Sequence, residues 1–344
     1  MGCQASGVEA PPSFSQNPPA PDFIGTQADW LNSKPLHLKD LRGKVVLVDF
    51  WEYTCVNCIR TFPYVKEWWK RYKDDGLVIV GIHTPEFKFA HSAANVQDAV
   101  KRFGLEFPIL IDSDYSNWNA YSNEYWPADY LIDAQGRIVE THFGEGDYGA
   151  TEKKIQQLLL ANHPGLKLPP LMAPVRDTDK PGAVCRPVTE EMYAGERGAQ
   201  NGQFGGGSFV AGREAAFQLP SRLAEGVFYL GGRWTPEEEH LDAAGDGSSL
   251  EISYRAKDCN AVLRRTGEPL RVEVLQDGKP VAKKDAGSDI RYDGATSYFT
   301  LDEPRMYNLT HNAIWGAHRL ELRPLSAGFQ IYSFAFSTDC MPGG

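Results

Sequence analysis

Two cysteines separated by two residues, Cys55 and Cys58, lie between a strongly apolar run and a helix-like segment. Residues 44–51 read KVVLVDFW, a nearly unbroken β-branched and aromatic run of the kind that forms a central strand covered on both faces. Residues 56–73 then show helical patterning. We therefore expect Cys55 at a helix N-terminus, where free backbone N–H groups and the helix dipole favour an anion such as a thiolate.

The first half of the chain alternates strand-like and helix-like segments, which predicts an α/β domain over residues 26–166. Such alternation is typical of a parallel or mixed sheet with helices on its faces. Beyond the segments that flank the cysteines, the expected elements are strands at 77–82 and 107–111, helices at 95–103 and 151–160, and a hairpin that joins 128–132 to 137–143.

The second half of the chain has a different pattern. Residues 167–183 contain four prolines, which is the composition of a linker. From residue 184 to residue 344, strand-like segments alternate with Gly, Asp and Pro turns, which predicts an all-β sandwich. The expected strands include 250–256, 270–275, 297–301, 318–322 and 329–336.

Charge and hydropathy exclude several classes of protein. The formal net charge is -10 and the chain has no basic block, whereas a nucleic-acid surface needs clustered Lys and Arg to displace counterions. The chain contains no run of about 18 apolar residues, so no transmembrane helix is predicted. With 42% hydrophobic and 23% charged residues, we expect a folded, water-soluble protein without a nucleic-acid partner.

Residues 1–25 form a Pro-rich segment that we interpret as a flexible leader. The Gly2-Cys3 pair resembles the start of a mature bacterial lipoprotein, which suggests a lipid on Cys3 and anchoring to a membrane. Gly2 and Ser6 also fit the myristoylation pattern. A cloning scar ahead of a disordered leader accounts for the same residues. The lipid on Cys3 is therefore one of three interpretations.

The two thiols have different expected roles. Cys55 is the expected nucleophile, and Cys58, one helical turn further and less exposed, is expected to resolve the mixed disulfide that forms at Cys55. A CxxC pair is also half of a zinc site, but no second CxxC or paired histidines follow at ligand spacing. We therefore expect redox chemistry at a Cys55–Cys58 disulfide, with no metal and no other cofactor.

Several residues around the cysteines resemble the thioredoxin active site. Asp49 falls where thioredoxins keep a buried carboxylate that exchanges a proton with the resolving cysteine, and Trp51 falls where they keep an aromatic residue. Pro63 matches their helix kink. The segment from Trp126 to Asp133 matches the strand that begins with their substrate-facing cis-proline, so the resemblance implies a cis bond before Pro127.

A narrower resemblance is to the C-terminal region of the DipZ family, within the TlpA and ResA group. It rests on the segments WEYTCVNC from Trp51, GIHTPEF from Gly81, YWPA from Tyr125 and FGEGDY from Phe143. The resemblance implies a thioredoxin fold followed by a jelly roll similar to carbohydrate-binding modules. It also implies an extracytoplasmic, periplasmic or membrane-anchored location, disulfide-containing exported proteins as clients and a membrane electron donor of CcdA or DsbD type. The active-site surroundings that it implies are Trp51, Glu52, Tyr53, Thr54, Val56, Asn57 and Trp126.

Other residues have a structural interpretation beside the functional one. Asp49 could be an ordinary strand-end polar residue, although a carboxylate within an apolar run is costly without a function. Trp51 and Tyr53 fit packing better than chemistry. His83 and Glu86 follow a strand end, where sites often lie, but capping explains them equally well. They are therefore left out of the expected catalytic set.

The sandwich region offers two further hypotheses. A disulfide between Cys185 and Cys340 would join its two ends, although spacing alone cannot fix the pairing or the state of Cys259. Aromatic residues of this region would form a platform for a glycan, but sandwiches use most aromatic residues as core, and we favour core. These residues are Trp234, Tyr292, Tyr298 and Trp315.

The favoured function is thiol-disulfide exchange on exported proteins, as a reductase. A thiol peroxidase of the peroxiredoxin type is an alternative, since Thr54 precedes Cys55 and peroxiredoxins share the fold. A glycan-binding or protein-binding module with a vestigial CxxC is another. The direction of electron flow stays open, because Val56 and Asn57 do not fix the reduction potential.

Overall fold

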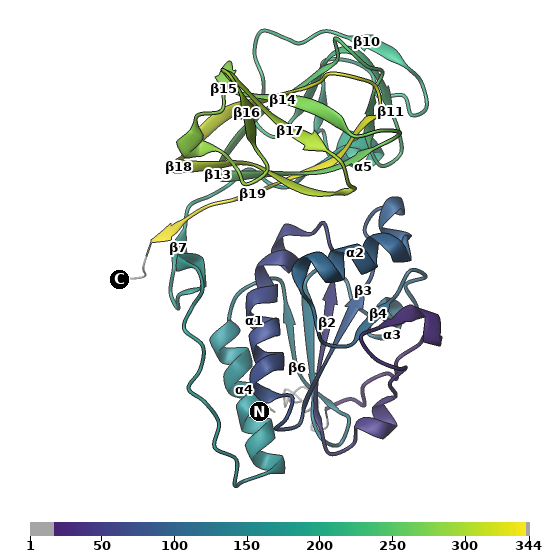
Figure 1. The fold of residues 1–344 in the computed structure, drawn as a ribbon, viewed down its shortest axis with the longest axis vertical. Coiled ribbons are helices and arrows are strands. Elements are labelled where there is room, and N and C mark those ends of the chain that lie inside the picture. The colour runs from purple at the N-terminus through teal and green to yellow at the C-terminus, as the bar shows by residue number, and fades with distance from the viewer. Residues whose placement is uncertain (1–16, 342–344) are drawn as a thin grey trace, which may run out of the picture.

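The computed structural model describes residues 17–341 and has an α/β part and a β part joined by an extended connection (Figure 1). In Figure 1 the β part lies across one end of the α/β part, and the connection runs beside α1 and α4. Among the described residues, no helix is both long enough and apolar enough to cross a bilayer.

The α/β part is built on a sheet with the order β1-β4-β3-β2-β5-β6. The central strands β2, β3 and β4 are parallel, and β1, β5 and β6 are antiparallel to their neighbours. The strands are β1 (Trp30–Leu31), β2 (Val45–Trp51), β3 (Leu77–His83), β4 (Ile109–Ile111), β5 (Ala128–Ile132) and β6 (Ile138–Phe143). The mixed sheet expected from the sequence is therefore present.

Two hydrophobic layers cover this sheet. Alternate residues of β2 point to opposite faces, so Val45 and Leu47 pack with α1, α2 and α4, whereas Val46 and Val48 pack with residues of the N-terminal segment and Tyr121. The helices are α1 (Val56–Tyr72), α2 (Ala93–Phe103), α3 (Ser116–Ala120) and α4 (Tyr148–Asn162). The short 3-10 helices of this part are η1 (Gln27–Asp29), η2 (Leu38–Leu41) and η3 (Lys88–His91).

The connection between the two parts is held against the helices by side chains. Glu152 of α4 is buried, and its carboxylate accepts the Met172 N–H at 2.7 Å and the Tyr72 hydroxyl at 2.6 Å. Tyr64 of α1 donates its hydroxyl to Asp179 at 2.7 Å. The proline-rich segment is therefore fastened to α1 and α4, and its one helix in the described chain is η4 (Asp177–Asp179).

The β part is an antiparallel sandwich whose core contains about thirty buried residues, including Trp234. Its main strand order is β10-β11-β12-β19-β13-β18-β14-β17-β16. The elements are β7 (Val184–Cys185), β8 (Met192–Tyr193), α5 (Gly195–Gln200), β9 (Phe204–Gly205), β10 (Ala215–Phe217), β11 (Phe228–Pro236), β12 (Leu241–Ala243), β13 (Ser249–Arg265), β14 (Leu270–Gln276), β15 (Lys279–Pro280), η5 (Lys283–Asp285), β16 (Arg291–Asp293), β17 (Thr296–Leu301), β18 (Arg305–Pro324), β19 (Phe329–Ser337) and β20 (Cys340–Met341).

Two strands of the sandwich are much longer than the sequence pattern predicted. The expected strands 250–256 and 318–322 are portions of β13 and β18, which pair along most of their lengths. Register shifts at Ala256/Asp258 and Cys259/Asn260 interrupt the alternation of inward and outward side chains. A bulge of this kind breaks the two-residue periodicity, so one continuous strand reads as separate short segments.

Cys185 and Cys340 form a disulfide that joins β7 to β20, and the two cysteines are register partners in that short sheet. The hypothesis of a bond between the two ends of the sandwich is confirmed. Cys259 is buried in the sandwich core and carries a free thiol.

The sandwich packs against the α/β part through a mixed interface. Tyr332 of β19 contacts the rings of Phe87 and Phe89, with centroid distances of 5.2 and 4.7 Å. Around this apolar contact, Arg197 of α5 pairs with Glu86 at 3.1 Å. Lys88 pairs with Glu238 at 2.5 Å. Residues from both parts therefore enclose the edge of the sheet at which β2 and β3 end.

Candidate active site

Cys55 follows the end of β2 and is the N-cap residue of α1. The backbone N–H of Cys58 donates to Cys55 Sγ at 3.2 Å, so the first turn of the helix is capped by the thiol itself. Cys55 is partly exposed, whereas Cys58 is fully buried, and both carry free thiols. This difference in exposure is the one expected for an attacking and a resolving cysteine.

Burial governs the ionisation of both thiols. Burial raises the pKa of Cys55, although hydrogen bonds from Cys58 act in the opposite direction. Burial raises the pKa of Cys58 well above its usual value. Desolvation therefore opposes the stabilisation of the Cys55 thiolate that the helix N-terminus and the hydrogen bonds from Cys58 provide. Cys55 nevertheless remains the thiol that ionises more readily.

Asp49 lies in β2 on the face that packs against α1, and it is buried. Its carboxylate has no hydrogen-bond partner among the described residues. Burial raises its pKa to about 7. Asp129 of β5 is its register partner, and burial together with the charge of Asp49 raises the pKa of Asp129 well above the usual range. The two neighbouring carboxyls therefore share at least one proton near neutral pH.

The peptide bond between Trp126 and Pro127 is cis, as the resemblance to thioredoxins implied. Ala128, the next residue, pairs with Phe50 in β2, so Pro127 lies beside the strand end that leads to Cys55. Trp126 donates its indole N–H to the carbonyl of Thr84 at 3.1 Å. This bond ties the cis-proline loop to the end of β3.

The turn between β2 and α1 contains most of the other expected residues. Trp51 packs edge-on against Phe62 and His83, with centroid distances of 5.4 and 4.9 Å. Tyr53 stacks on His83 at 5.4 Å, and both aromatic residues are buried. Thr54 is buried and donates to Glu52 at 2.6 Å through its backbone N–H. Trp51 and Tyr53 thus pack against the turn rather than present polar atoms to a client.

Val56 and Asn57 form the first turn of α1 and are half-buried. Arg60 donates to Asn57 at 3.3 Å and to Glu145 at 3.1 Å. Asn57, Arg60 and Glu145 line a groove of about 380 Å³ whose other wall contains the Cys185–Cys340 disulfide. The first turn of the redox helix therefore opens on a groove that both parts of the molecule build.

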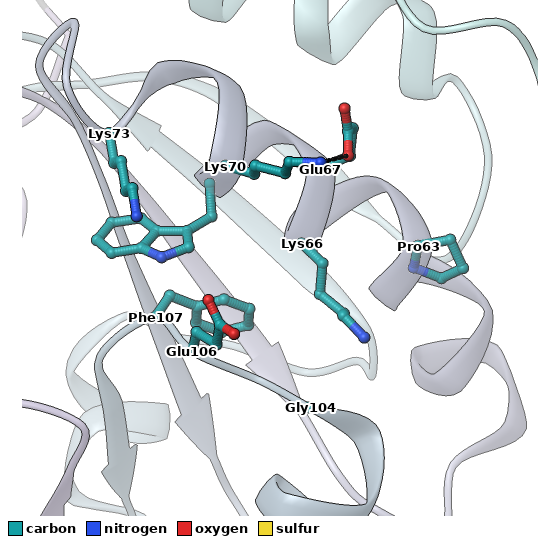
Figure 2. Close-up of a pocket in the computed structure, with 9 residues that line it drawn as sticks. Pro63, Lys66, Glu67, Lys70, Lys73, Gly104, Glu106 and Phe107 are labelled. Carbon is teal, nitrogen blue, oxygen red and sulfur yellow. Dashed lines mark ion pairs between the residues drawn. The ribbon is translucent and has the colours of Figure 1, made fainter.

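A second groove, of about 470 Å³, lies along the C-terminal half of α1 (Figure 2). Lys66, Lys73 and Phe107 line it, and the ammonium group of Lys73 lies 5.9 Å from the centre of the Trp69 ring. Lys66 donates to the carbonyl of Phe103 at 2.7 Å. No cysteine lines this groove, so we place the redox site at the other end of the helix.

Glu86 and its neighbours were not among the expected site residues. Burial raises the pKa of Glu86 to about 8, and the nearby carboxyls of Glu191 and Glu52 act in the same direction. Arg197 pairs with Glu86, and Tyr193 donates its hydroxyl to Glu191 at 2.8 Å. The position of Glu86 after a buried strand was the available signal, but its partners come from a distant part of the chain.

The remaining expectations have mixed outcomes. Trp234 is fully buried in the sandwich core, whereas the three other platform candidates are partly exposed, each beneath a cationic side chain. They are Tyr292, Tyr298 and Trp315. Within residues 17–341, no three His, Cys, Asp or Glu side chains gather as metal ligands would. Cys3, the residue proposed to carry a lipid, lies outside the described residues.

Comparison with known proteins places this geometry in a family. Residues 17–141 match the AhpC/TSA family, and residues 189–337 match the thioredoxin-like C-terminal domain family. Protein DipZ of Mycobacterium tuberculosis is 38% identical over 320 residues, which cover 92% of this chain and 42% of that protein. The thiol-disulfide oxidoreductase ResA of Bacillus cereus is 34% identical over 139 residues, covering 40% of this chain and 76% of ResA. The chain belongs to the thioredoxin-like thiol-disulfide oxidoreductases.

Membership of this family confirms the thioredoxin fold of the α/β part and the likeness to DipZ. The chain spans less than half the length of the DipZ proteins that it matches. Among solved structures, a thiol-disulfide isomerase from Corynebacterium glutamicum is 25% identical, with a TM-score of 0.37, and covers 41% of this chain and 96% of its own.

Proposed function

We propose that this protein reduces disulfide bonds in other proteins through its Cys55–Cys58 pair. The Cys55 thiolate attacks one sulfur of a client disulfide, which forms a mixed disulfide and releases the other client sulfur as a thiolate. Cys58 then attacks Cys55 Sγ, which forms the Cys55–Cys58 disulfide and releases the second client thiolate. The client gains two electrons, and the dithiol of the protein loses them.

The observation that carries the proposal is the pairing of a partly exposed Cys55 with a buried Cys58 whose N–H donates to Cys55 Sγ. Asp49 supplies the base in this scheme. With a pKa near 7, its carboxylate can accept the Cys58 proton during resolution and return it later. The cis-proline loop at Pro127 is the expected contact for the backbone of the client.

The direction is proposed from the ionisation of the thiols. A strongly stabilised thiolate favours the dithiol over the disulfide and makes a protein oxidising, as in DsbA. Here burial raises the pKa of both Cys55 and Cys58, so the dithiol lacks that stabilisation. A reducing potential follows from this argument, and the membrane electron donor of CcdA or DsbD type would regenerate the dithiol.

Insulin reduction and redox equilibration test the proposal. We expect the wild type to accelerate insulin precipitation by dithiothreitol, and its equilibrium with thiol buffers to give a potential near that of thioredoxin, about -270 mV. Cys58→Ser is expected to accumulate mixed disulfides with clients, which mass spectrometry would identify. A potential near that of DsbA, about -120 mV, would contradict the reductase direction.

The cellular setting is part of the same proposal. Exported proteins as clients, an extracytoplasmic location and a lipid on Cys3 all rest on the resemblance to DipZ and on the first residues of the chain. Mass spectrometry of the native protein tests the anchor, and a mature form without diacylglycerol on Cys3 would contradict it. Titration calorimetry with sugars tests the alternative in which the sandwich binds a glycan.

A thiol peroxidase is the second candidate, because residues 17–141 match the AhpC/TSA family. Peroxide would oxidise Cys55 to a sulfenic acid, and Cys58 would then form the disulfide with loss of water. Consumption of peroxide that survives Cys58→Ser would favour this function. Insulin reduction without peroxide consumption would exclude it in favour of the reductase.

A further inference from the structure

A second buried carboxylate, that of Glu52, lies in the turn that leads to Cys55. Glu52 has 0% of its surface exposed, and its Oε2 accepts both the backbone N–H of Thr54 at 2.6 Å and the Thr54 hydroxyl at 2.5 Å. The carbonyl of Glu52 accepts the N–H of Cys55 at 3.3 Å. Glu52 therefore holds the turn that presents the nucleophile through both its side chain and its backbone.

The bonds to Glu52 suit an ionised carboxylate. In both of the bonds made by Oε2 the oxygen accepts, as it must in every hydrogen bond to an ionised carboxylate. The other oxygen, Oε1, has no hydrogen-bond partner among residues 17–341 and lies 3.8 Å from Nε2 of His83. His83 is also fully buried, and neither of its ring nitrogens has a hydrogen-bond partner in that range.

The position of His83 follows from the strand register. Trp51 and His83 are partners in the parallel pair of β2 and β3, so the residue after Trp51 is brought close to the imidazole. The rings of Trp51 and Tyr53 enclose the imidazole at 4.9 and 5.4 Å. A buried carboxylate is costly unless hydrogen-bond donors or a cation compensate it, and the N–H and hydroxyl of Thr54 supply the donors to Glu52.

We propose that Glu52, with His83 beside it, is a positioning residue that keeps the Cys55–Cys58 pair reducing by holding a fixed negative charge in the turn that leads to Cys55. The inference rests on the proposed redox function. A negative charge disfavours a thiolate nearby, and a less stable thiolate makes the disulfide more favourable relative to the dithiol. Glu52 thereby sets the potential without exchanging atoms with the client.

Other titratable groups around Cys55 do not replace Glu52. Asp49 is the register partner of Asp129 in β5 and accepts no hydrogen bond among the described residues, so it suits proton exchange better than a permanent charge. Glu86 also acts unfavourably on the Cys55 thiolate, but Arg197 lies 3.1 Å from its carboxylate and offsets it. Cys58 and Tyr53, the remaining titratable groups at the turn, are neutral donors at neutral pH.

The test is Glu52→Gln, which keeps the shape of the side chain and an oxygen that can accept from Thr54 while it removes the charge. The rate at which iodoacetamide modifies Cys55 is measured from pH 5 to pH 10. We expect about ten times more thiolate than in the wild type at pH values below both pKa values, which is a shift of one pKa unit. In glutathione buffers, the equilibrium should move toward the dithiol by a similar factor, about 30 mV.

Two matched variants distinguish charge from structure. Glu106→Gln removes an exposed carboxylate and should leave the Cys55 titration unchanged. Thr54→Val removes one hydrogen bond to Glu52 but keeps the charge, so it should lower stability without advancing the titration. If Glu52→Gln does not fold, Glu52→Asp keeps the charge and should retain the wild-type pH profile.

The proposal is overturned if folded Glu52→Gln reacts with the wild-type pH profile, or if its titration moves to higher pH. It is also overturned if Glu52→Asp advances the titration. Failure of the proposed function is a separate result. In that case the wild type would not equilibrate with glutathione or reduce insulin, whereas the alkylation profile of Cys55 would still measure the effect of Glu52.

Discussion

The two halves of the molecule treat their buried polar groups differently. In the sandwich, Tyr254 shares a 3.0 Å hydrogen bond with Thr310 and donates to Gln276, which in turn donates to Asn312 at 2.8 Å. At the end of β2, the carboxylate of Asp49 has no partner among the described residues. Among the described residues, most buried polar side-chain atoms without a hydrogen-bond partner lie in the α/β part, and the few in the sandwich include Ser333 Oγ.

This difference indicates where buried groups lower stability because their chemistry is needed. Buried polar groups are normally paired, because an unpaired group loses its hydration without compensation. Groups that break this rule concentrate at functional sites, where a proton or charge must remain available. The unpaired carboxyls lie beside the redox cysteines, so the α/β half carries the proposed chemistry and the sandwich core carries mainly stability.

The largest expected contrast is between two cysteines. Cys55→Ser should reduce insulin-reducing activity to the uncatalysed rate with little change in stability, because serine also caps helix N-termini. Cys259→Ser should leave activity intact but lower the free energy of unfolding by about 1–3 kcal/mol, because its hydroxyl would lie in an apolar core. Insulin turbidity and urea unfolding measure the two effects. Loss of activity in Cys259→Ser would break the comparison.

Removal of a large side chain from the sandwich core should also lower stability without changing the redox chemistry. Trp234 is fully buried, and its indole N–H donates to the carbonyl of Gly231 at 2.9 Å. We expect Trp234→Ala to lower the free energy of unfolding by about 3–5 kcal/mol. The reduction potential of Cys55 and Cys58 should remain that of the wild type. A changed potential in the folded variant would mean that the sandwich core is coupled to the chemistry.

Replacement of Asp49 should raise stability, in contrast to replacement of Trp234, and the gain should depend on pH. The pKa of Asp49 is raised to about 7, so its contribution is fully present below the unfolded value near 4 and is lost as the pH rises through 7. A shift of about three units corresponds to an upper bound of about 4 kcal/mol. We expect Asp49→Asn to melt above the wild type at pH 8 and close to it at pH 4, and to resolve mixed disulfides more slowly. Equal melting shifts at both pH values would contradict this assignment.

The interface pair should give the smallest effect. Arg197 has 58% of its side chain exposed, and exposed ion pairs contribute at most about 1 kcal/mol. Arg197→Gln should therefore lower the melting temperature only slightly, and the loss should shrink at high salt. A large loss would show that Arg197 is essential to the joint between the two halves.

The turn from β2 to α1 that contains Cys55 and Cys58 could be predicted from the sequence because the residues that determine it are close together in the chain. A buried strand, a CxxC spacing and a helix lie within thirty residues, and the exposure of Cys55 and burial of Cys58 follow from helix geometry. Pro127 required the likeness to thioredoxins, because a cis bond leaves no unique local pattern.

Features that depend on distant pairing could not be predicted. Asp129 lies opposite Asp49 only because β5 pairs antiparallel with β2, and Glu86 meets Arg197 only because the sandwich docks where it does. The desolvation that raises the pKa of Cys55 has the same origin, since residues of both halves pack around the site. A sequence pattern shows the periodicity of one segment, but it does not show which residues of two distant segments lie opposite each other.

The Cys185–Cys340 bond also has a topological consequence. It closes a loop with a sequence separation of 155 residues. In the chain-entropy model, the cross-link lowers the entropy of the unfolded chain and so stabilises the folded state by about 5 kcal/mol. Because the bond joins β7 to β20, the chain enters and leaves the sandwich at nearly one point. The sandwich is therefore joined to the rest of the described chain at one place. Evolution or an engineer can replace it with another domain without changing the chain connections of the segment 45–72 and its sheet.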